Sequence, residues 1–416
     1  MTIPVNRSKS FNQRTIGHET PKSPSFGTIK VNRIGVLSFQ FSALLIIGFL
    51  LFFTVAIAGS YFFLLPHLPW ATRGFHLPRF NDSTATCDFF DGEWVIDDSY
   101  PLYNASECPF AEQGFNCLGN GRKDEDYLKW RWRPRNCNIQ RFNVSYVLEK
   151  IRNKRIVFVG DSMSRTQWES FICLLMTGVE DKNSVYEVNS SRITKQIRYL
   201  CVRFSSFNST VEFFRSVFLV EQSSKSKHAP RRVKSTLKLD KLDDISNEWI
   251  DSDVLVFNTG QWWVSWKIFE TGCYFQVGNT VKLGMPISNA FRIALETWAS
   301  WIKERLDTQR THVFLRTYEP SHWSIDGNHK FCNVTRFPSP EKKATGAVSF
   351  AEIAMDVVKR AEVPASVLQV TAMSASRSDA HVGGWNDEPS TPDCSHWCLP
   401  GVPDMWNEVL LSIWLS

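Results

Sequence analysis

An uncharged apolar run at residues 41–65 divides the chain and limits how it can fold. Its 25 residues are enough for a helix to span a bilayer. The tail before it holds six basic residues and a single acid, so the positive-inside rule predicts a cytosolic N-terminus and a single-pass type II membrane protein. A cleaved signal peptide is the alternative, but its apolar core would be shorter and nearer the N-terminus.

The cysteines agree with this topology, because all ten of them follow the apolar run. Cysteine-rich segments of this kind are typical of an oxidising compartment, so we expect disulfides in a lumenal domain. Six N-x-S/T sequons lie on the same side of the run and are expected in surface loops. They begin at Asn81, Asn104, Asn143, Asn189, Asn208 and Asn333.

Composition predicts five regions along the chain. Residues 1–33 are polar and basic, as in a disordered cytosolic tail; residues 34–65 contain the membrane anchor, and the proline-containing residues 66–86 form a short stem. Residues 87–143 hold four cysteines and little periodicity, which indicates a small module held by disulfides. Residues 144–416 are expected to form the main domain.

From about residue 144, short apolar runs alternate with amphipathic segments. This pattern predicts βαβ units and therefore a three-layer α/β/α domain, in which a parallel sheet lies between helices. The predicted strands lie within residues 154–162, 253–260, 312–317 and 366–373, and the predicted helices within residues 164–176, 288–306, 350–361 and 405–415.

The charge of the chain gives little indication of a nucleic-acid partner. The formal net charge is only +5, and the basic residues are dispersed. One basic stretch, residues 225–238, interrupts the α/β pattern, and we interpret it mainly as a solvated loop. Contact with an acidic glycan is the alternative for this stretch.

The triplet Gly160, Asp161, Ser162 follows an apolar strand and precedes a helix that we expect to begin near Ser164. Open α/β sheets bind ligands at this edge, and backbone N–H groups at a helix start can stabilise an oxyanion. A serine hydroxyl becomes a good nucleophile only when a base takes its proton. The triplet alone is weak evidence, since strands often end in glycine turns.

A second motif, Asp393, Cys394, Ser395, His396, supplies the missing base. An aspartate three residues before a histidine can reach one ring nitrogen and leave the other free for the serine. A lone D-x-x-H would be read as a surface turn. Together with the G-D-S triplet, and with cysteines on both sides of the histidine, it predicts a catalytic triad of Ser162, His396 and Asp393.

The segment FNTGQWW offers candidates for two further roles. Gly160, Asn258 and Gly260 could form an oxyanion hole, although an ordinary turn at the end of a strand explains them equally well. Trp262 and Trp263 are candidate platforms for a sugar ring, with core packing as an equal alternative. No metal site is predicted.

Five ordered motifs resemble the plant trichome birefringence-like family of cell-wall polysaccharide O-acetyltransferases. They are CDFFDGEWV, KWRWRPRNC, VFVGDSMSRTQWES, FNTGQWW and DCSHWCLPGVPDMWNEVL, and the resemblance runs from about Cys87 to the C-terminus. It implies a GDSL/SGNH-like fold and places Ser162, Asp393 and His396 on the family's nucleophile and D-x-x-H positions.

The same resemblance implies the partners and the location. We expect acetyl-CoA or a derived acetyl donor as co-substrate, no bound cofactor, and a polysaccharide acceptor such as pectin or xylan. It also implies a Golgi membrane protein, with an acetyl-donor membrane protein as a further partner. A polysaccharide acetyl esterase and a non-catalytic glycan-binding wall protein are the alternative functions.

The chain departs from the family pattern at two places. Gln261 stands where the family commonly has histidine, and the segment 316–335 differs from the family's Gly- and Trp-richer version. Both departures concern the choice of acceptor more than the reaction. Arg377, Asp379 and His381 fit another family segment, and His381 is the rival candidate for the catalytic base.

The expected disulfides would join the histidine loop to distant parts of the chain. The arrangement that we expect pairs Cys87 with Cys137, Cys108 with Cys173, Cys117 with Cys398, and Cys332 with Cys394, although ten cysteines permit many other pairings. Cys201 and Cys273 remain, either as a fifth bridge or as two buried thiols. These pairs would hold the N-terminal module against the active site.

Overall fold

The computed structural model describes residues 87–416 except 195, 225–228, 327–328, 340–344 and 389–390. The predicted tail, membrane anchor and stem lie outside these residues. No helix in the described part of the chain is long and apolar enough to cross a membrane. Thr86–Ser416 form one compact unit.

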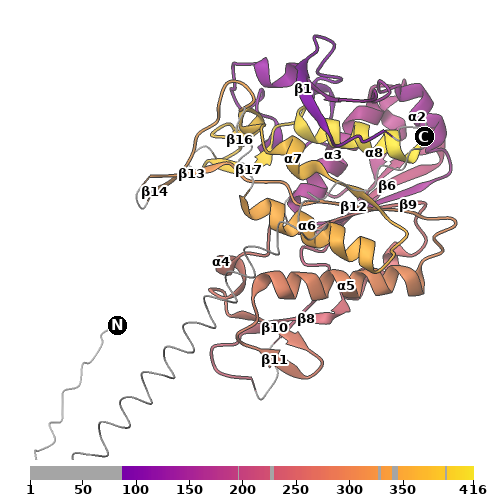
Figure 1. Ribbon diagram of the computed structural model, residues 1–416. Coiled ribbons are helices and arrows are strands. Elements are labelled where there is room, and N and C mark those ends of the chain that lie inside the picture. The colour runs from indigo at the N-terminus through magenta and orange to yellow at the C-terminus, as the bar shows by residue number, and fades with distance from the viewer. Residues whose placement is uncertain (1–86, 195, 225–228, 327–328, 340–344, 389–390) are drawn as a thin grey trace, which may run out of the picture. The chain divides into compact units, whose positions relative to one another are not determined.

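A seven-stranded sheet forms the centre of the molecule, with strand order β15-β12-β9-β3-β6-β5-β4 (Figure 1). The strands β15, β12, β9, β3 and β6 are parallel, as the βαβ pattern predicts. The strands β5 and β4 at one end of the sheet pair antiparallel, and neither they nor the parallel strand β6 were predicted. The bounds are β3 Arg155–Gly160, β4 Val185–Glu187, β5 Tyr199–Phe204, β6 Ser209–Arg215, β9 Val254–Asn258, β12 His312–Arg316 and β15 Ser366–Leu368.

Alternating side chains of β3 serve two separate cores. Ile156 and Phe158 pack on one face of the sheet, and Val157 and Val159 pack on the other. Helices cover both faces, which confirms the predicted α/β/α layering (Figure 1). The first face holds α2 (Val144–Lys150), α3 (Ser162–Met176) and α8 (Val402–Trp414), and the second holds α5 (Ile287–Arg305) and α6 (Thr345–Arg360).

A second sheet of four strands, in the order β11-β10-β8-β7, packs against α5 and was not predicted. It corrects the interpretation of the basic stretch, because residues 235–238 belong to a strand and not to a loop. Leu237 and Leu239 alternate with polar residues and face the core, the pattern of a half-buried strand. The bounds are β7 Val220–Ser224, β8 Ser235–Leu242, β10 Cys273–Val277 and β11 Thr280–Lys282, with α4 (Ser265–Ile268) before β10.

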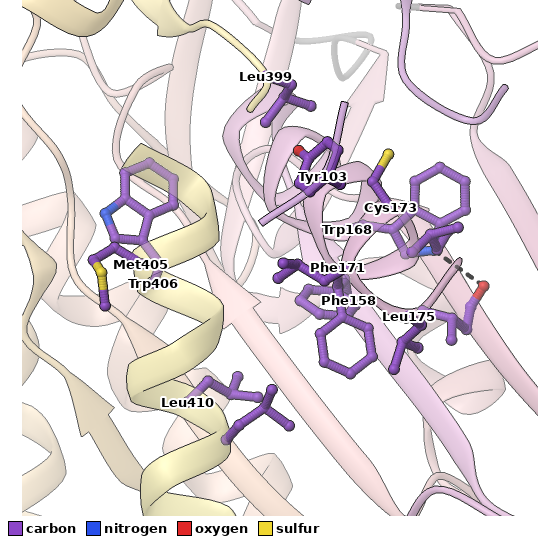
Figure 2. Close-up of a cluster of buried hydrophobic side chains, with 14 of the residues drawn as sticks. Tyr103, Phe158, Trp168, Phe171, Cys173, Leu175, Leu399, Met405, Trp406 and Leu410 are labelled. Carbon is purple, nitrogen blue, oxygen red and sulfur yellow. Dashed lines mark hydrogen bonds between the residues drawn. The ribbon is translucent and has the colours of Figure 1, made fainter. Parts of the chain in front are cut away.

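The N-terminal module shares the core of the catalytic domain. Its strands β1 (Gly92–Ile96) and β2 (Trp130–Pro134) pair antiparallel. Its side chains Phe110 and Phe115 join the cluster around α3 and α8, as does Tyr103, which Figure 2 shows beside Cys173. Every residue of α3 after Ser162 is buried. The module therefore covers a helix face that would otherwise meet solvent.

Four disulfides join eight of the ten cysteines, and they are the four pairs expected from the sequence. Cys108–Cys173 ties the module to α3, and Cys117–Cys398 ties it to the loop that follows His396. Cys201 and Cys273 are buried free thiols and not a fifth bridge.

The predicted strand at residues 366–373 is only partly a strand. β15 ends at Leu368, and Val370–Ser374 form the short helix α7. The remaining elements are two short antiparallel pairs near the C-terminal half of the site. They are β13 (Trp323–Asp326) with β14 (His329–Cys332), and β16 (His381–Gly383) with β17 (Asp393–Trp397).

Candidate active site

Ser162 lies at the carboxyl end of β3, where the strand turns into α3. The helix begins at Ser162, two residues earlier than predicted, because the Asp161 side chain accepts a hydrogen bond from the Met163 N–H at 2.9 Å and caps it. Gly160 is required at this turn: its φ is +158°, and a Cβ there would lie 2.1 Å from Asn258 Oδ1. The turn therefore packs tightly while Ser162 stays accessible.

His396 joins Ser162 to Asp393 in one hydrogen-bonded chain. Its Nε2 lies 2.7 Å from Ser162 Oγ, and its Nδ1 lies 2.6 Å from Asp393 Oδ2. The other oxygen of Asp393 accepts hydrogen bonds from the backbone N–H groups of Ser395 and His396, at 2.8 and 3.0 Å. The structure thus brings together the predicted nucleophile, base and orienting acid, whose sequence positions are up to 234 residues apart.

The Asp393 carboxyl is held in its ionised form. Burial raises its pKa, but the charge of His396 and the hydrogen bonds from the His396 ring and backbone outweigh burial and hold the pKa well below its usual value. An ionised acid fixes the Nδ1–H tautomer of His396 and leaves Nε2 free to accept the serine proton.

Phe115 of the N-terminal module stacks on the His396 ring, with centroids 5.4 Å apart. The guanidinium of Arg165 also lies over the Phe115 ring, and Arg165 forms ion pairs with Glu112 and Glu169. Sequence reasoning missed Phe115, because no local pattern marks it. The nearest signal was Cys117, whose expected pairing with Cys398 brings this part of the module to the histidine loop.

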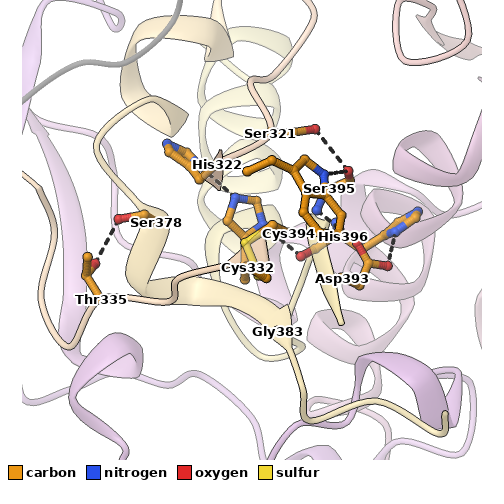
Figure 3. Close-up of a disulfide and its surroundings, with 12 residues drawn as sticks. Ser321, His322, Cys332, Thr335, Ser378, Gly383, Asp393, Cys394, Ser395 and His396 are labelled. Carbon is orange, nitrogen blue, oxygen red and sulfur yellow. Dashed lines mark hydrogen bonds and ion pairs between the residues drawn. A yellow bond between two sulfur atoms is a disulfide. The ribbon is translucent and has the colours of Figure 1, made fainter. Parts of the chain in front are cut away.

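The segment 316–335, which departs from the family pattern, supports the strand that carries Asp393 and His396 (Figure 3). Cys332 is bonded to Cys394, and Ser321 Oγ and Trp323 Nε1 each donate a hydrogen bond to Ser395 Oγ at 3.0 Å. The backbone N–H of His322 donates to the Cys394 carbonyl oxygen at 3.0 Å. This segment therefore positions β17.

Comparison with known proteins shows the family of the chain. A model of a GDSL/SGNH-like acyl-esterase family found in Pmr5 and Cas1p matches residues 139–413, and a Pmr5 N-terminal domain model matches residues 85–138. The chain is 57% identical over 417 residues to trichome birefringence-like 7 of Arabidopsis thaliana, a match that covers 98% of this chain and 93% of that protein. The chain belongs to the trichome birefringence-like family.

Two further relatives from Arabidopsis thaliana are more distant. Trichome birefringence-like 6 is 41% identical over 334 residues, covering 78% of this chain and 70% of that protein. Trichome birefringence-like 41 is 39% identical over 344 residues, covering 80% of this chain and 92% of that protein. The family placement and the hydrogen-bonded Ser162, His396 and Asp393 together indicate chemistry at an acyl ester.

In this trichome birefringence-like chain His381 does not contact the serine. It is fully buried, its Nδ1 donates to the His396 carbonyl oxygen at 2.9 Å, and its Nε2 lies 2.6 Å from His322 Nδ1. Burial, followed by the charge of His322, lowers the pKa of His381 to about 3. Arg377 and Asp379 form a buried ion pair at 2.9 Å. Of the two candidate bases, His396 and not His381 contacts the Ser162 hydroxyl.

The predicted oxyanion-hole residues lie at the same edge of the sheet. Asn258 is buried, and its amide bonds Asp161: its Oδ1 accepts from the Asp161 N–H, and its Nδ2 donates to Asp161 Oδ1, both at 3.2 Å. The second hydrogen of Nδ2 is not used by these bonds. The oxyanion-hole role of Asn258, Gly160 and Gly260 therefore stays a prediction.

The prediction that Trp263 forms a platform for a sugar ring is wrong. Trp263 is 1% exposed and packs against Phe218 and Phe291 in the core between the two sheets. Trp262 is half-buried, and the cations of Arg215 and Lys267 lie over its ring at 5.2 and 4.2 Å from the centroid. Trp262 therefore belongs to a cluster of cations and aromatic rings.

Gln261 turns toward the end of β12. Its Nε2 donates to the Glu319 carbonyl oxygen at 3.0 Å, and Glu319 is fully buried against Arg316. The side chain of Gln261 thus bonds to the backbone of Glu319 and has no contact with Ser162 or His396 among its hydrogen bonds. Among the described residues, no group of three or more His, Cys, Asp and Glu side chains could hold a metal ion.

Proposed function

We propose that this protein transfers an acetyl group, through an acyl-serine intermediate, onto a hydroxyl of a plant cell-wall polysaccharide such as pectin or xylan. The observation that carries the proposal is the hydrogen-bonded chain from Ser162 Oγ through His396 to Asp393. Family membership supports the acyl chemistry. The acetyl donor is acetyl-CoA or a donor derived from it.

The residues perform the reaction in two displacements. His396 Nε2 takes the Ser162 proton while Oγ attacks the acetyl carbonyl carbon, and the donor's leaving group departs with the proton that His396 returns. An acceptor hydroxyl then gives its proton to His396 and attacks the acyl-serine. The Ser162 Oγ bond to the acetyl carbon breaks, and the serine recovers its proton. Asp393 stabilises the imidazolium in both steps.

The proposed location is the Golgi membrane, with the catalytic domain in the lumen. The apolar residues 41–65 and the basic tail before them support a single-pass type II topology. The disulfides support an oxidising compartment. An acetyl-donor membrane protein is the proposed partner on the donor side.

The test is an acceptor panel incubated with acetyl donor and the full-length protein. We expect acetylated oligosaccharides, detected by mass, with one preferred ring position. Ser162→Ala should abolish transfer while its melting temperature and glycan binding stay unchanged. Net deacetylation of acetylated glycans in the presence of donor would overturn transfer.

An acetyl esterase is the second candidate, because the matched family is described as acyl-esterases and the triad is shared. The two reactions differ in whether water or a sugar hydroxyl attacks the acyl-serine. A non-catalytic glycan-binding protein is the third candidate. It is disfavoured because the three triad side chains remain in hydrogen-bond contact.

A further inference from the structure

A cavity of about 650 Å³ has Arg215 and Ser216 in its wall. Arg215 is the last residue of β6 and pairs in register with Gly160 at the end of β3. The Ser216 N–H donates to the Gly160 carbonyl oxygen at 2.8 Å. Because neighbouring strands of a sheet lie about 4.8 Å apart, this wall of the cavity begins next to the turn that carries Ser162.

The other charged side chains in the cavity wall have partners of opposite charge. Arg198 forms ion pairs with Asp243, at 2.6 Å, and with Asp244. Lys241 forms an ion pair with Glu221 at 2.5 Å. These two cations and three carboxylates therefore pair with one another.

Arg215 is different, because no described carboxylate lies within ion-pair distance of its guanidinium. Its close neighbour is the Trp262 ring, with the centroid 5.2 Å away. Burial lowers the pKa of Arg215, and the charge of Asp161, which acts in the opposite direction, does not offset this. The Asp161 side chain is itself bonded to Met163 and Asn258. A half-buried cation without a direct partner favours an anionic ligand.

We propose that Arg215 binds the carboxylate of a uronic acid residue in the acceptor glycan, beside the sugar whose hydroxyl reaches Ser162. The inference rests on the proposed acetyl transfer and adds the class of acceptor. The planar guanidinium can bind a carboxylate through two parallel hydrogen bonds. Contact with the Trp262 ring restricts the guanidinium before the ligand arrives, which lowers the entropic cost of binding.

Charge balance favours a carboxylate over a phosphate. One unpaired cation balances one negative charge, and a uronate carries one at neutral pH. Asp243 and Asp244 line the same cavity, and their charges oppose a multiply charged phosphate more strongly than a carboxylate. The phosphates of an acetyl-CoA donor are therefore the weaker candidate.

The experiment compares Arg215→Gln and Arg215→Lys in the full-length chain. The acceptors are a galacturonate oligosaccharide and the same oligosaccharide with its carboxyls reduced to alcohols. The donors are acetyl-CoA and a phosphate-free aryl acetate. Arg360→Gln is the matched control, because Arg360 is 76% exposed and ion-paired at the end of α6.

We expect the ratio of kcat/KM between the acidic and the reduced acceptor to fall about 10- to 100-fold in Arg215→Gln, with either donor. Arg215→Lys should retain part of the ratio, since it keeps the charge and loses the planar fork. Arg360→Gln should leave the ratio unchanged. An equal loss on both acceptors would overturn the proposal, and a loss confined to acetyl-CoA would assign Arg215 to the donor instead.

Calorimetry separates this proposal from the proposed reaction. In a Ser162→Ala background, which needs no turnover, the acidic oligosaccharide should bind more tightly than the reduced one, and Arg215→Gln should remove the difference. If the wild type transfers no acetyl group and this binding difference persists, only the proposed reaction fails. If both oligosaccharides bind alike, the role of Arg215 fails whatever the activity.

Discussion

His322 Nδ1 and His381 Nε2 lie 2.6 Å apart, beside the strand that carries the catalytic residues. The outer nitrogen of each ring faces a backbone carbonyl: His381 Nδ1 is 2.9 Å from His396 O, and His322 Nε2 is 2.8 Å from Ala375 O. Carbonyl oxygens only accept hydrogen bonds, so both outer nitrogens carry hydrogen. The inner contact needs a third N–H, one more than two neutral rings possess. We therefore expect the pair to hold one extra proton.

Burial, followed by the charge of His322, lowers the pKa of His381 to about 3, so we expect His381 to be the neutral ring and to donate to the His396 backbone. We expect His381→Phe, which keeps a ring against Trp397, to lower kcat about 10-fold with little change in KM, because one buried hydrogen bond that positions His396 is lost. Imidazole ¹⁵N NMR of the wild type should show three N–H groups on the pair. Two N–H groups, with wild-type kcat in His381→Phe, would contradict this arrangement.

Asp393→Asn should lower kcat by roughly 10³- to 10⁴-fold, because the amide cannot stabilise the His396 imidazolium and favours the wrong tautomer. The rate of acyl-enzyme formation from an aryl acetate measures the effect. Asp98→Asn is a suitable control, since Asp98 is exposed in a turn of the N-terminal module. A loss of less than tenfold would remove Asp393 from the triad.

The stacking of Phe115 on His396 predicts a contribution from the N-terminal module to catalysis. We expect Phe115→Leu to lower kcat several-fold by letting the imidazole rotate, and Phe115→Tyr to restore most of it. Phe337→Leu, at an exposed phenylalanine, should leave kcat unchanged. Equal kcat in the Leu and Tyr variants of Phe115 would mean that the ring acts only by filling space.

Two disulfides of similar loop length should differ in their effect on activity. Cys332–Cys394 closes 62 residues and holds β17, whereas Cys87–Cys137 closes 50 residues within the N-terminal module. Replacing either pair by alanines should cost about 2–4 kcal/mol of unfolding free energy. Only the Cys332 and Cys394 double variant should also lose kcat. Matched kcat values in both double variants would argue against a positioning role for Cys332–Cys394.

The raised pKa of buried Glu408 predicts that the free energy of unfolding falls as pH rises. Tyr100 Oη donates to both oxygens of the Glu408 carboxyl at 2.9 Å, and burial raises its pKa from 4.5 to about 8. A raised folded-state pKa means that the folded protein binds the proton of Glu408 more tightly than the unfolded chain does. The contribution of Glu408 to the free energy of unfolding is therefore fully present below pH 4.5 and is lost as pH rises toward 8. The slope is at most about 1.4 kcal/mol per pH unit for this group.

Denaturant unfolding between pH 5 and about pH 8 checks this slope. Glu408→Gln keeps an acceptor for Tyr100 and cannot ionise, so we expect a flatter dependence on pH. Glu304→Gln, at an exposed position of α5, should keep the wild-type slope. A Glu408→Gln slope equal to that of the wild type would contradict the raised pKa.

Local sequence patterns determined much of the fold and the core of the site. Alternation of apolar runs and amphipathic segments predicted four of the five parallel strands and four of the helices that cover them, because side-chain periodicity depends on neighbouring residues alone. Ser162 was found because a strand, a glycine turn and a helix start adjoin it. Asp393 was found because a spacing of three residues lets its carboxylate reach the ring of His396.

Only the tertiary structure decided which aromatic and charged side chains face the site. Trp262 and Trp263 are adjacent in sequence, yet Trp263 is buried by Phe218 and Phe291, which arrive from other elements. Phe115 and His381 reach His396 through contacts that no local pattern encodes. Burial and hydrogen bonding depend on which distant segments pack together, so a residue's environment follows from the folded chain and not from its neighbours in sequence.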